Sequence, residues 1–103
     1  MCVMYKVTVL YEHPEDVGQF EKHFREQHLP LAKKMHGVSK IEITKFDSSA
    51  DGGEPEYYGM SEIFFGSKAE MEETMGSPEG QATINDLLNL TKTGVKVLLG
   101  NVE

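Results

Sequence analysis

The fold of this chain is decided by one stretch, HLPLAKKMHGV at residues 28–38. The proline at position 30 has no backbone N–H to donate, and it biases Leu29 away from helical geometry. Gly37 then marks a helix stop, and an apolar/polar alternation starts at Val38. The stretch therefore predicts a helix that kinks near Leu29, makes one short further turn and leads into a β-strand.

Upstream of this stretch, the sequence predicts an amphipathic helix that begins at Pro14, where a fixed φ suits the first helical turn. On a wheel of about 100° per residue, four apolar residues cluster on one side. These are Val17, Phe20, Phe24 and Leu31. His28 falls at roughly the edge of that cluster. We therefore expect its imidazole to face inward, toward whatever the helix covers.

Apolar residues that recur with a period of two predict four strands. The strands are expected at residues 1–11, 38–46, 57–65 and 95–102. A polar segment at residues 47–56, rich in Ser, Asp and Gly, predicts a loop between the second and third strands. The order β-α-β-β-α-β is the ferredoxin-like arrangement. We therefore predict an α+β fold, with a four-stranded antiparallel sheet and helices on one face.

The second helical region is expected in two parts, because Ser67 and Ser77 each open a helix with a capping signal. The second part is expected to end at Gly94. Its expected buried line consists of Ile84, Leu87, Leu88 and Thr91.

Size and composition limit the classes of protein to which this chain can belong. A length of 103 residues predicts a single domain, residues 1–103. The formal net charge of −7 repels nucleic acid phosphates and anionic lipids, so we expect no nucleic acid or membrane partner. Cys2 is the single cysteine and cannot form an internal disulfide. With no apolar run long enough to span a bilayer, these features predict a cytoplasmic protein.

The two faces of the predicted sheet differ in composition. Odd-numbered strand positions are almost entirely apolar and suit the face that the helices cover, whereas even-numbered positions are mixed. An uncovered mixed face would leave a large apolar patch in water, so we expect a homodimer through this face. Its expected interface residues are Lys6, Glu42, Tyr58, Glu62 and Phe64. A Lys–Glu pair is expected there; alternatively, these polar residues solvate the face of a monomer.

The candidate chemistry centres on His28, because an imidazole exchanges protons near neutral pH and partial burial tunes its pKa. Tyr5 projects to the same helix-covered side and is the second candidate catalytic residue. Alternatively, His28 only caps backbone carbonyls at the disturbed helix end. The expected substrate-binding residues are Phe24, Leu31, Met35 and Ser61.

We expect neither a metal nor a cofactor in this chain. His23 and His28 are five residues apart and diverge on an α-helix, so they do not form the paired ligands of a zinc helix. No glycine motif for binding a flavin or nicotinamide phosphate is seen.

Four short motifs occur in a characteristic order along almost the whole chain. They are Tyr11-Glu12 before the Pro-containing helix start, His28-x-Pro30-Leu31, Gly37-Val38, and Ser77-Pro78-Glu79-Gly80. In this order and spacing, the chain resembles the EthD family of dimeric α/β-barrel proteins. The resemblance implies two ferredoxin-like subunits that pack sheet to sheet. It also implies kinship with cofactor-free monooxygenases and muconolactone isomerases, which act on hydrophobic, often aromatic or polyketide-like molecules.

Of the family's motif positions, only His28 carries over to this chain as a functional residue, with Pro30 and Leu31 as its neighbours. The expected function is binding of a hydrophobic small molecule by a cofactor-independent, monooxygenase-like oxidoreductase in degradation or secondary metabolism. One alternative is a dehydratase or isomerase. The other is a non-catalytic ligand carrier or an accessory protein to an oxygenase.

Overall fold

A computed structural model describes residues 4–91 and 94–103 of the chain. Its elements are β1 (Tyr5–Tyr11), α1 (Val17–His23), the π-helix η1 (Phe24–His28), α2 (Leu29–Lys33), β2 (Val38–Lys45), β3 (Gly59–Phe65), α3 (Lys68–Gly76), α4 (Pro78–Leu90) and β4 (Val95–Asn101). The four strands form one sheet in the order β2-β3-β1-β4, and all neighbours are antiparallel. This topology confirms the predicted α+β, ferredoxin-like fold. Residues 1–3 of the predicted first strand lie outside the described residues.

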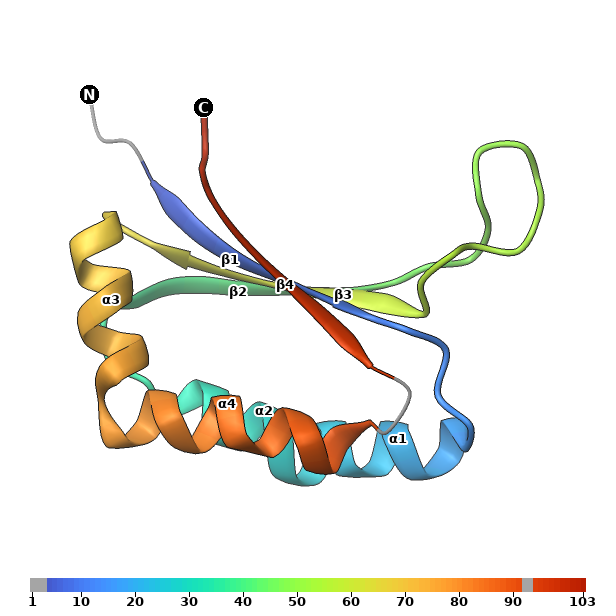
Figure 1. Cartoon of the computed structure of the whole chain (residues 1–103), viewed down its shortest axis with the longest axis horizontal. Helices are drawn as coiled ribbons and strands as arrows, with labels where there is room; N and C mark the ends of the chain where they lie inside the picture. Colours follow the sequence, from blue (N-terminus) through green and yellow to red (C-terminus); the bar gives the residue numbers. More distant parts are fainter. Residues whose placement is uncertain (1–3, 92–93) are drawn as a thin grey trace.

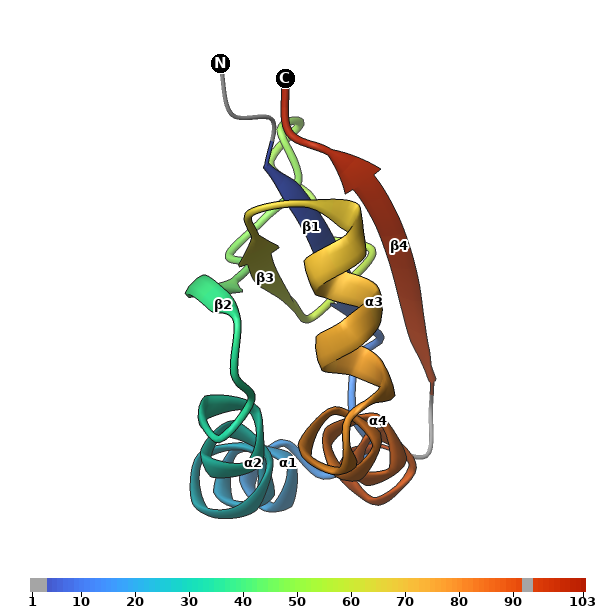
Figure 2. The same cartoon turned by 90° about the vertical axis from the view of Figure 1, so that its left-hand side faces the viewer.

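The helices lie on one side of the sheet (Figure 1). Figure 2 shows α1 and α2 beside α4 in this layer, with α3 standing across one end. The hydrophobic core fills the space between sheet and helices at the middle strands, where Val7, Val9 and Phe65 are buried. Burial therefore alternates along β1 as the period-two pattern predicts.

The helix layer does not reach the edges of the sheet. Val97 and Leu99 of β4 pair with the buried Val9 and Val7, so they belong to the inner face. They nevertheless remain 48% and 55% exposed, and Ile43 on β2 is 46% exposed. Apolar side chains of the inner face are thus left without helical cover, and a cavity results.

The expected departure of Leu29 from helical geometry is wrong. The chain stays helical there, with φ −62° and ψ −41°, and the preceding turn widens instead into the π-helix η1. Its signature is the N–H of Leu29, which donates to the carbonyl of Phe24, five residues back. In a regular α-helix the ring of Pro30 would clash with the carbonyl four residues earlier, and a wider turn gives it room.

The expected buried line of α4 is also wrong in part. Ile84 and Leu88 are 37% and 82% exposed. The buried residues are Gly80, Thr83, Asp86 and Leu90. The face of α4 that packs on the other helices therefore carries polar side chains, which a search for aliphatic residues does not find. Thr91 is half-buried. The expected end at Gly94 is wrong as well, because α4 ends at Leu90 and Thr91 is already extended, with φ −147° and ψ 143°.

No helix of the described residues packs on the outer face of the sheet. The expected Lys–Glu pair is confirmed there, because Lys6 Nζ lies 2.7 Å from Glu62 Oε2. Phe64 is covered by lysines, with Lys40 Nζ 4.5 Å and Lys6 Nζ 5.6 Å from its ring centroid. Glu42 pairs with Lys40 at 3.0 Å. Cation–π contacts and ion pairs thus reduce the apolar area of this face without removing it.

Tyr58 does not belong to the outer face, which corrects its predicted place. The strand begins at Gly59, so the alternation does not extend back to Tyr58. Its ring packs edge-on against Phe20 of α1 at 5.3 Å, and its hydroxyl donates to Glu21.

Among the described residues, no helix has the length and apolar character needed to cross a membrane.

Candidate active site: an apolar cavity with a buried histidine

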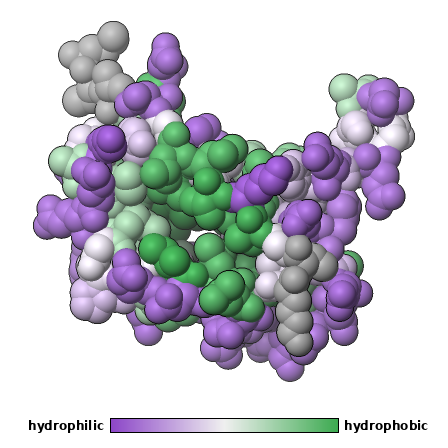
Figure 3. Space-filling view, viewed as in Figure 1, coloured by the Kyte–Doolittle hydropathy of each residue, from purple (hydrophilic) through white to green (hydrophobic). Residues whose placement is uncertain are grey.

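A cavity of about 380 Å³ lies between the sheet and the helices. Figure 3 shows its hydrophobic mouth as a hollow on the side where β4 and α4 face the viewer. Most of its lining is aliphatic, aromatic or thioether. Four polar side chains also line it: Tyr11, His28, Ser61 and Thr83. A largely apolar cavity of about 300–1,000 Å³ with a few polar groups is typical of small-molecule sites.

His28 is held by a carboxylate from another helix. Its Nδ1 lies 2.9 Å from Oδ2 of Asp86 in α4, and the two side chains are 7% and 9% exposed. A carboxylate only accepts hydrogen bonds, so Nδ1 of His28 carries a proton and donates it. In the neutral imidazole, Nε2 then has a free lone pair. Among the described residues, every fully buried side-chain polar atom has a hydrogen-bond partner. Nε2 of His28 makes no hydrogen bond with these residues, so it is not fully buried. Because His28 lines the cavity, Nε2 is accessible from it.

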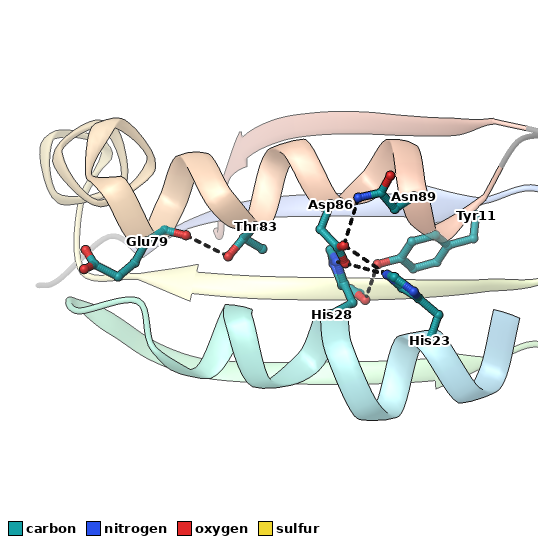
Figure 4. A network of polar contacts seen from close by, with 8 residues as sticks. Tyr11, His23, His28, Glu79, Thr83, Asp86 and Asn89 are labelled. Carbon is teal, nitrogen blue, oxygen red and sulfur yellow. Dashed lines mark hydrogen bonds and ion pairs between the residues drawn. The ribbon is translucent and has the colours of Figure 1, made fainter. Parts of the chain in front are cut away.

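His23 binds the same carboxylate from the other side (Figure 4). Its Nε2 lies 3.0 Å from both oxygens of Asp86. The expectation that His23 and His28 diverge is therefore wrong. Residues five apart lie about 140° apart on an α-helix, but a π turn places them nearly over one another. The π-helix η1 is thus the reason that both imidazoles reach Asp86.

Burial and the contacts within this cluster shift the pKa values of His28 and Asp86 in opposite directions. Burial in the apolar site lowers the pKa of His28 below its usual 6.5, and the hydrogen bond and charge of Asp86 only partly offset this. His28 is therefore neutral at neutral pH. For Asp86, burial raises the pKa, but the hydrogen bonds from His23 and His28 outweigh it and hold the pKa below 3.8. The pair consists of a carboxylate and a neutral imidazole, which is the form that accepts a proton at Nε2.

Tyr11 is the second polar group of the cavity. Its hydroxyl lies 2.8 Å from Oγ of Ser61 on the neighbouring strand. Burial raises the pKa of Tyr11 to about 12, although the hydrogen bond with Ser61 acts against the shift. The phenol therefore stays protonated and can donate a hydrogen bond to an oxygen of a bound molecule.

The structure brings only some of the predicted site residues together. His28, Phe24, Met35 and Ser61 line the cavity, whereas Tyr5 and Leu31 do not. Tyr5 lies on the expected face of β1 but at the start of this strand, opposite Phe65. Leu31 borders a separate depression with Lys34, Pro78, Glu79 and Ala82.

Two residues of the site were missed by sequence reasoning. Tyr11 lies on the same face of β1 as Tyr5, and only the placement of the helices decides which tyrosine reaches the cavity. Asp86 carried no local signal, because it lies outside the expected aliphatic line of α4, and its burial is seen only in the structure. The alternative role of His28 as a cap of backbone carbonyls is not what the structure shows, since its Nδ1 binds Asp86.

The cluster of His23, His28 and Asp86 is a hydrogen-bonded group in which both imidazoles donate to the carboxylate. Within residues 4–91 and 94–103, no group of three or more His, Cys, Asp or Glu side chains is arranged to hold a metal ion.

The sequence matches the EthD domain over residues 12–87. The chain belongs to the EthD family. It is 37% identical over 100 residues to an uncharacterized 11.0 kDa protein in the thcB-thcC intergenic region of Rhodococcus erythropolis, covering 97% of this chain and 96% of that protein. An EthD family protein from Bacillus halodurans has a crystal structure with a TM-score of 0.91 and 27% identity, over 97% of this chain and 99% of that one.

More distant structures share the fold of this EthD protein. A dimeric ferredoxin-like protein of unknown function from Bacteroides fragilis has a TM-score of 0.67 and 19% identity, covering 96% of each chain. SnoaB, a cofactor-independent oxygenase from Streptomyces nogalater, has a TM-score of 0.67 and 11% identity, covering 100% of this chain and 95% of that one. At these identities the likeness shows the fold alone.

Proposed function

We propose that this EthD protein binds a hydrophobic small molecule in the cavity and removes a proton from it with Nε2 of His28. The observation that carries the proposal is the pair of His28 and Asp86 set into an otherwise apolar lining. Asp86 is a positioning residue: it fixes the tautomer of His28 and stabilises the imidazolium that forms. His23 in turn holds the carboxylate of Asp86. Tyr11 donates a hydrogen bond to the oxygen on which negative charge develops.

Cofactor-independent oxidation is the reaction that this arrangement serves best. Removal of a proton from an activated aromatic gives an electron-rich carbanion that can react with molecular oxygen directly. In the balanced reaction, a CH₂ group and O₂ give a carbonyl group and water, so the substrate supplies all the electrons. That SnoaB, with the same fold, is a cofactor-independent oxygenase supports this choice by analogy only.

Dehydration or isomerisation is the second candidate, because each also begins with transfer of a proton to a base such as His28. Oxygen consumption separates the two. An oxidation uses one O₂ per molecule converted, whereas dehydration and isomerisation use none.

Filling the cavity is expected to abolish ligand binding. Ala32 is 5% exposed and lines the cavity, so the ring in Ala32→Phe would occupy the space of the ligand. We expect naphthols to bind the wild-type protein with micromolar affinity and the variant at least tenfold more weakly, as measured by titration calorimetry. Ala82→Phe is the matched control, because Ala82 borders only the separate depression on the outer side of the helices.

Equal binding by the wild-type protein and the Ala32→Phe variant, with both proteins folded, would contradict the cavity as the binding site. Binding that depends on Ala32 without any turnover would favour the carrier or accessory role over catalysis.

We further infer that the protein is a homodimer through the outer face of its sheet. Half-buried Met60 and Leu10 pair with each other on this face, and Leu98 nearby is 55% exposed. Burial of such a surface against a second copy is the simplest way to remove it from water. The dimeric protein from Bacteroides fragilis with the same fold is consistent with this assembly.

The dimer predicts a mass in solution of about 23 kDa, twice the chain mass of 11.5 kDa, by size-exclusion chromatography with light scattering at micromolar concentration. Met60→Glu should shift this mass to that of the monomer, because the new carboxylate would be buried at the interface. Leu88→Glu, on the exposed side of α4, should leave the dimer intact. A wild-type mass of 11.5 kDa would refute the paired sheets.

A further inference from the structure

A second cavity, of about 330 Å³, adjoins the first. The two share four lining residues: Tyr11, Phe24, Leu29 and Ile43. The first cavity has its mouth at the side of β4 and α4, whereas the second extends toward α1 and the β2 edge of the sheet, where Lys45 lies. The shared side chains stand between the two cavities, so a molecule that occupies both has to pass Leu29 and Ile43.

The rim of the second cavity is polar and carries more positive than negative charge. Glu21 Oε2 lies 3.4 Å from Nζ of Lys45, and its Oε1 lies 3.4 Å from Nε of Arg25. Tyr58 donates its hydroxyl proton to the same carboxylate. This hydrogen bond from Tyr58 is the main reason that the pKa of Glu21 is lowered. Two cations thus surround one carboxylate, which leaves one positive charge in excess.

The two cations are free to turn toward a ligand. Their side chains are 72% exposed for Arg25 and 55% for Lys45, and contacts of 3.4 Å are long for ion pairs. Exposed pairs of this kind hold their partners weakly. The whole chain carries a charge of −7, but screening at physiological salt limits the reach of a charge to about 8 Å. A ligand in this cavity therefore meets the local positive excess.

We propose that the second cavity receives the anionic end of an elongated ligand whose apolar end lies beside His28. This inference rests on the proposed function and specifies its substrate class as an aryl or alkyl carboxylate or a comparable organic anion. Lys45 binds the anionic group, Arg25 supports it, and the phenol ring of Tyr58, 5.7 Å from Nζ of Lys45, forms a wall of the site.

The test compares ω-phenylalkanoates of increasing chain length with their uncharged primary amides in titration calorimetry. We expect the acids to bind more tightly than the amides once the chain is long enough to reach the rim. Lys45→Gln should weaken binding of the long acids by about tenfold, the effect of losing one charge-assisted hydrogen bond. It should leave the amides unchanged. Addition of salt should weaken the acids alone.

Lys96→Gln is the matched control. Lys96 is exposed and lies 5.8 Å from the ring of Tyr57, an arrangement like that of Lys45 and Tyr58, but it lines neither cavity. Both variants change one surface lysine, and their thermal unfolding curves should match the wild type. Arg25→Gln serves as a second variant at the rim, with a smaller expected loss.

Equal affinity for acids and amides at every chain length, or equal effects of Lys45→Gln and Lys96→Gln, would overturn the inference. In that outcome the proposed function stands as long as neutral naphthols still bind and Ala32→Phe still blocks them. If the neutral ligands also fail to bind, the proposed function fails as well, so the two failures are distinguishable.

Discussion

Replacement of His28 by glutamine is expected to lower the turnover of a cavity ligand by a factor of about 10²–10⁴, the usual contribution of a general base. The glutamine amide can donate a hydrogen bond to Asp86 as Nδ1 of His28 does, but it cannot accept a proton from the substrate. Ligand affinity should change little, because the lining is otherwise apolar. The loss should therefore appear in kcat and not in KM, as measured by oxygen uptake and product formation.

His36→Gln is the control for this experiment. His36 is exposed, and its described contact is made by the backbone carbonyl, which accepts from Thr74 at 2.7 Å. Its replacement should leave turnover unchanged. Retention of turnover by His28→Gln, in a protein that remains folded, would mean that another group takes the proton.

Asp86→Asn is expected to have the second-largest effect. It should change both the stability of the protein and the titration of His28. The carboxylate accepts from two imidazoles at 2.9–3.0 Å in a side chain that is 9% exposed. An amide cannot satisfy both donors and brings an N–H of its own. We expect a loss of about 1–3 kcal/mol in the free energy of unfolding, the cost of an unsatisfied buried polar group, as measured by urea denaturation.

The same substitution should lower the pKa of His28 further, because the hydrogen bond and charge of Asp86 are what raise it. The sign of the effect on stability follows. Between the folded-state pKa of His28 and 6.5, the unfolded chain binds a proton that the folded chain does not, so stability falls as the pH falls through this window. The slope is at most about 1.4 kcal/mol per pH unit for one proton. Asp86→Asn should extend this window to lower pH.

Asp47→Asn is the control for the Asp86 substitution, because Asp47 is exposed in the loop between β2 and β3. It should change neither the stability nor the titration of His28. An Asp86→Asn protein with an unchanged His28 titration would contradict the coupling of the two side chains.

The fold was predictable because its signals are local. Alternation along β1 and β3, and the serine caps of α3 and α4, each depend on residues within one or two turns. The site was predictable only in part. Its central residue, His28, was found because a titratable group stood close to an apolar stripe. The same stripe, on the same helix, predicted that His28 is buried.

The wrong predictions concern residues whose positions depend on the π-helix or on packing between elements, which rules based on local sequence do not include. An α-helical wheel misplaced Leu31 and His23, because the turn between them is a π-helix that changes the phase of every following residue. Tyr5 and Tyr11 are equivalent in the alternation of β1, and only packing distinguishes them. Asp86 resembles a solvated helix residue until the two histidines of the facing helix are placed against it.

The central claim is that Asp86 holds His28 as a neutral base whose Nε2 is open to the cavity. Long-range ¹H–¹⁵N correlation spectra of the histidine rings at neutral pH test it most directly, because they report the protonation of each ring nitrogen. The account predicts a neutral His28 with its proton on Nδ1 and none on Nε2. A ring protonated at both nitrogens, or a neutral ring with its proton on Nε2, would contradict it.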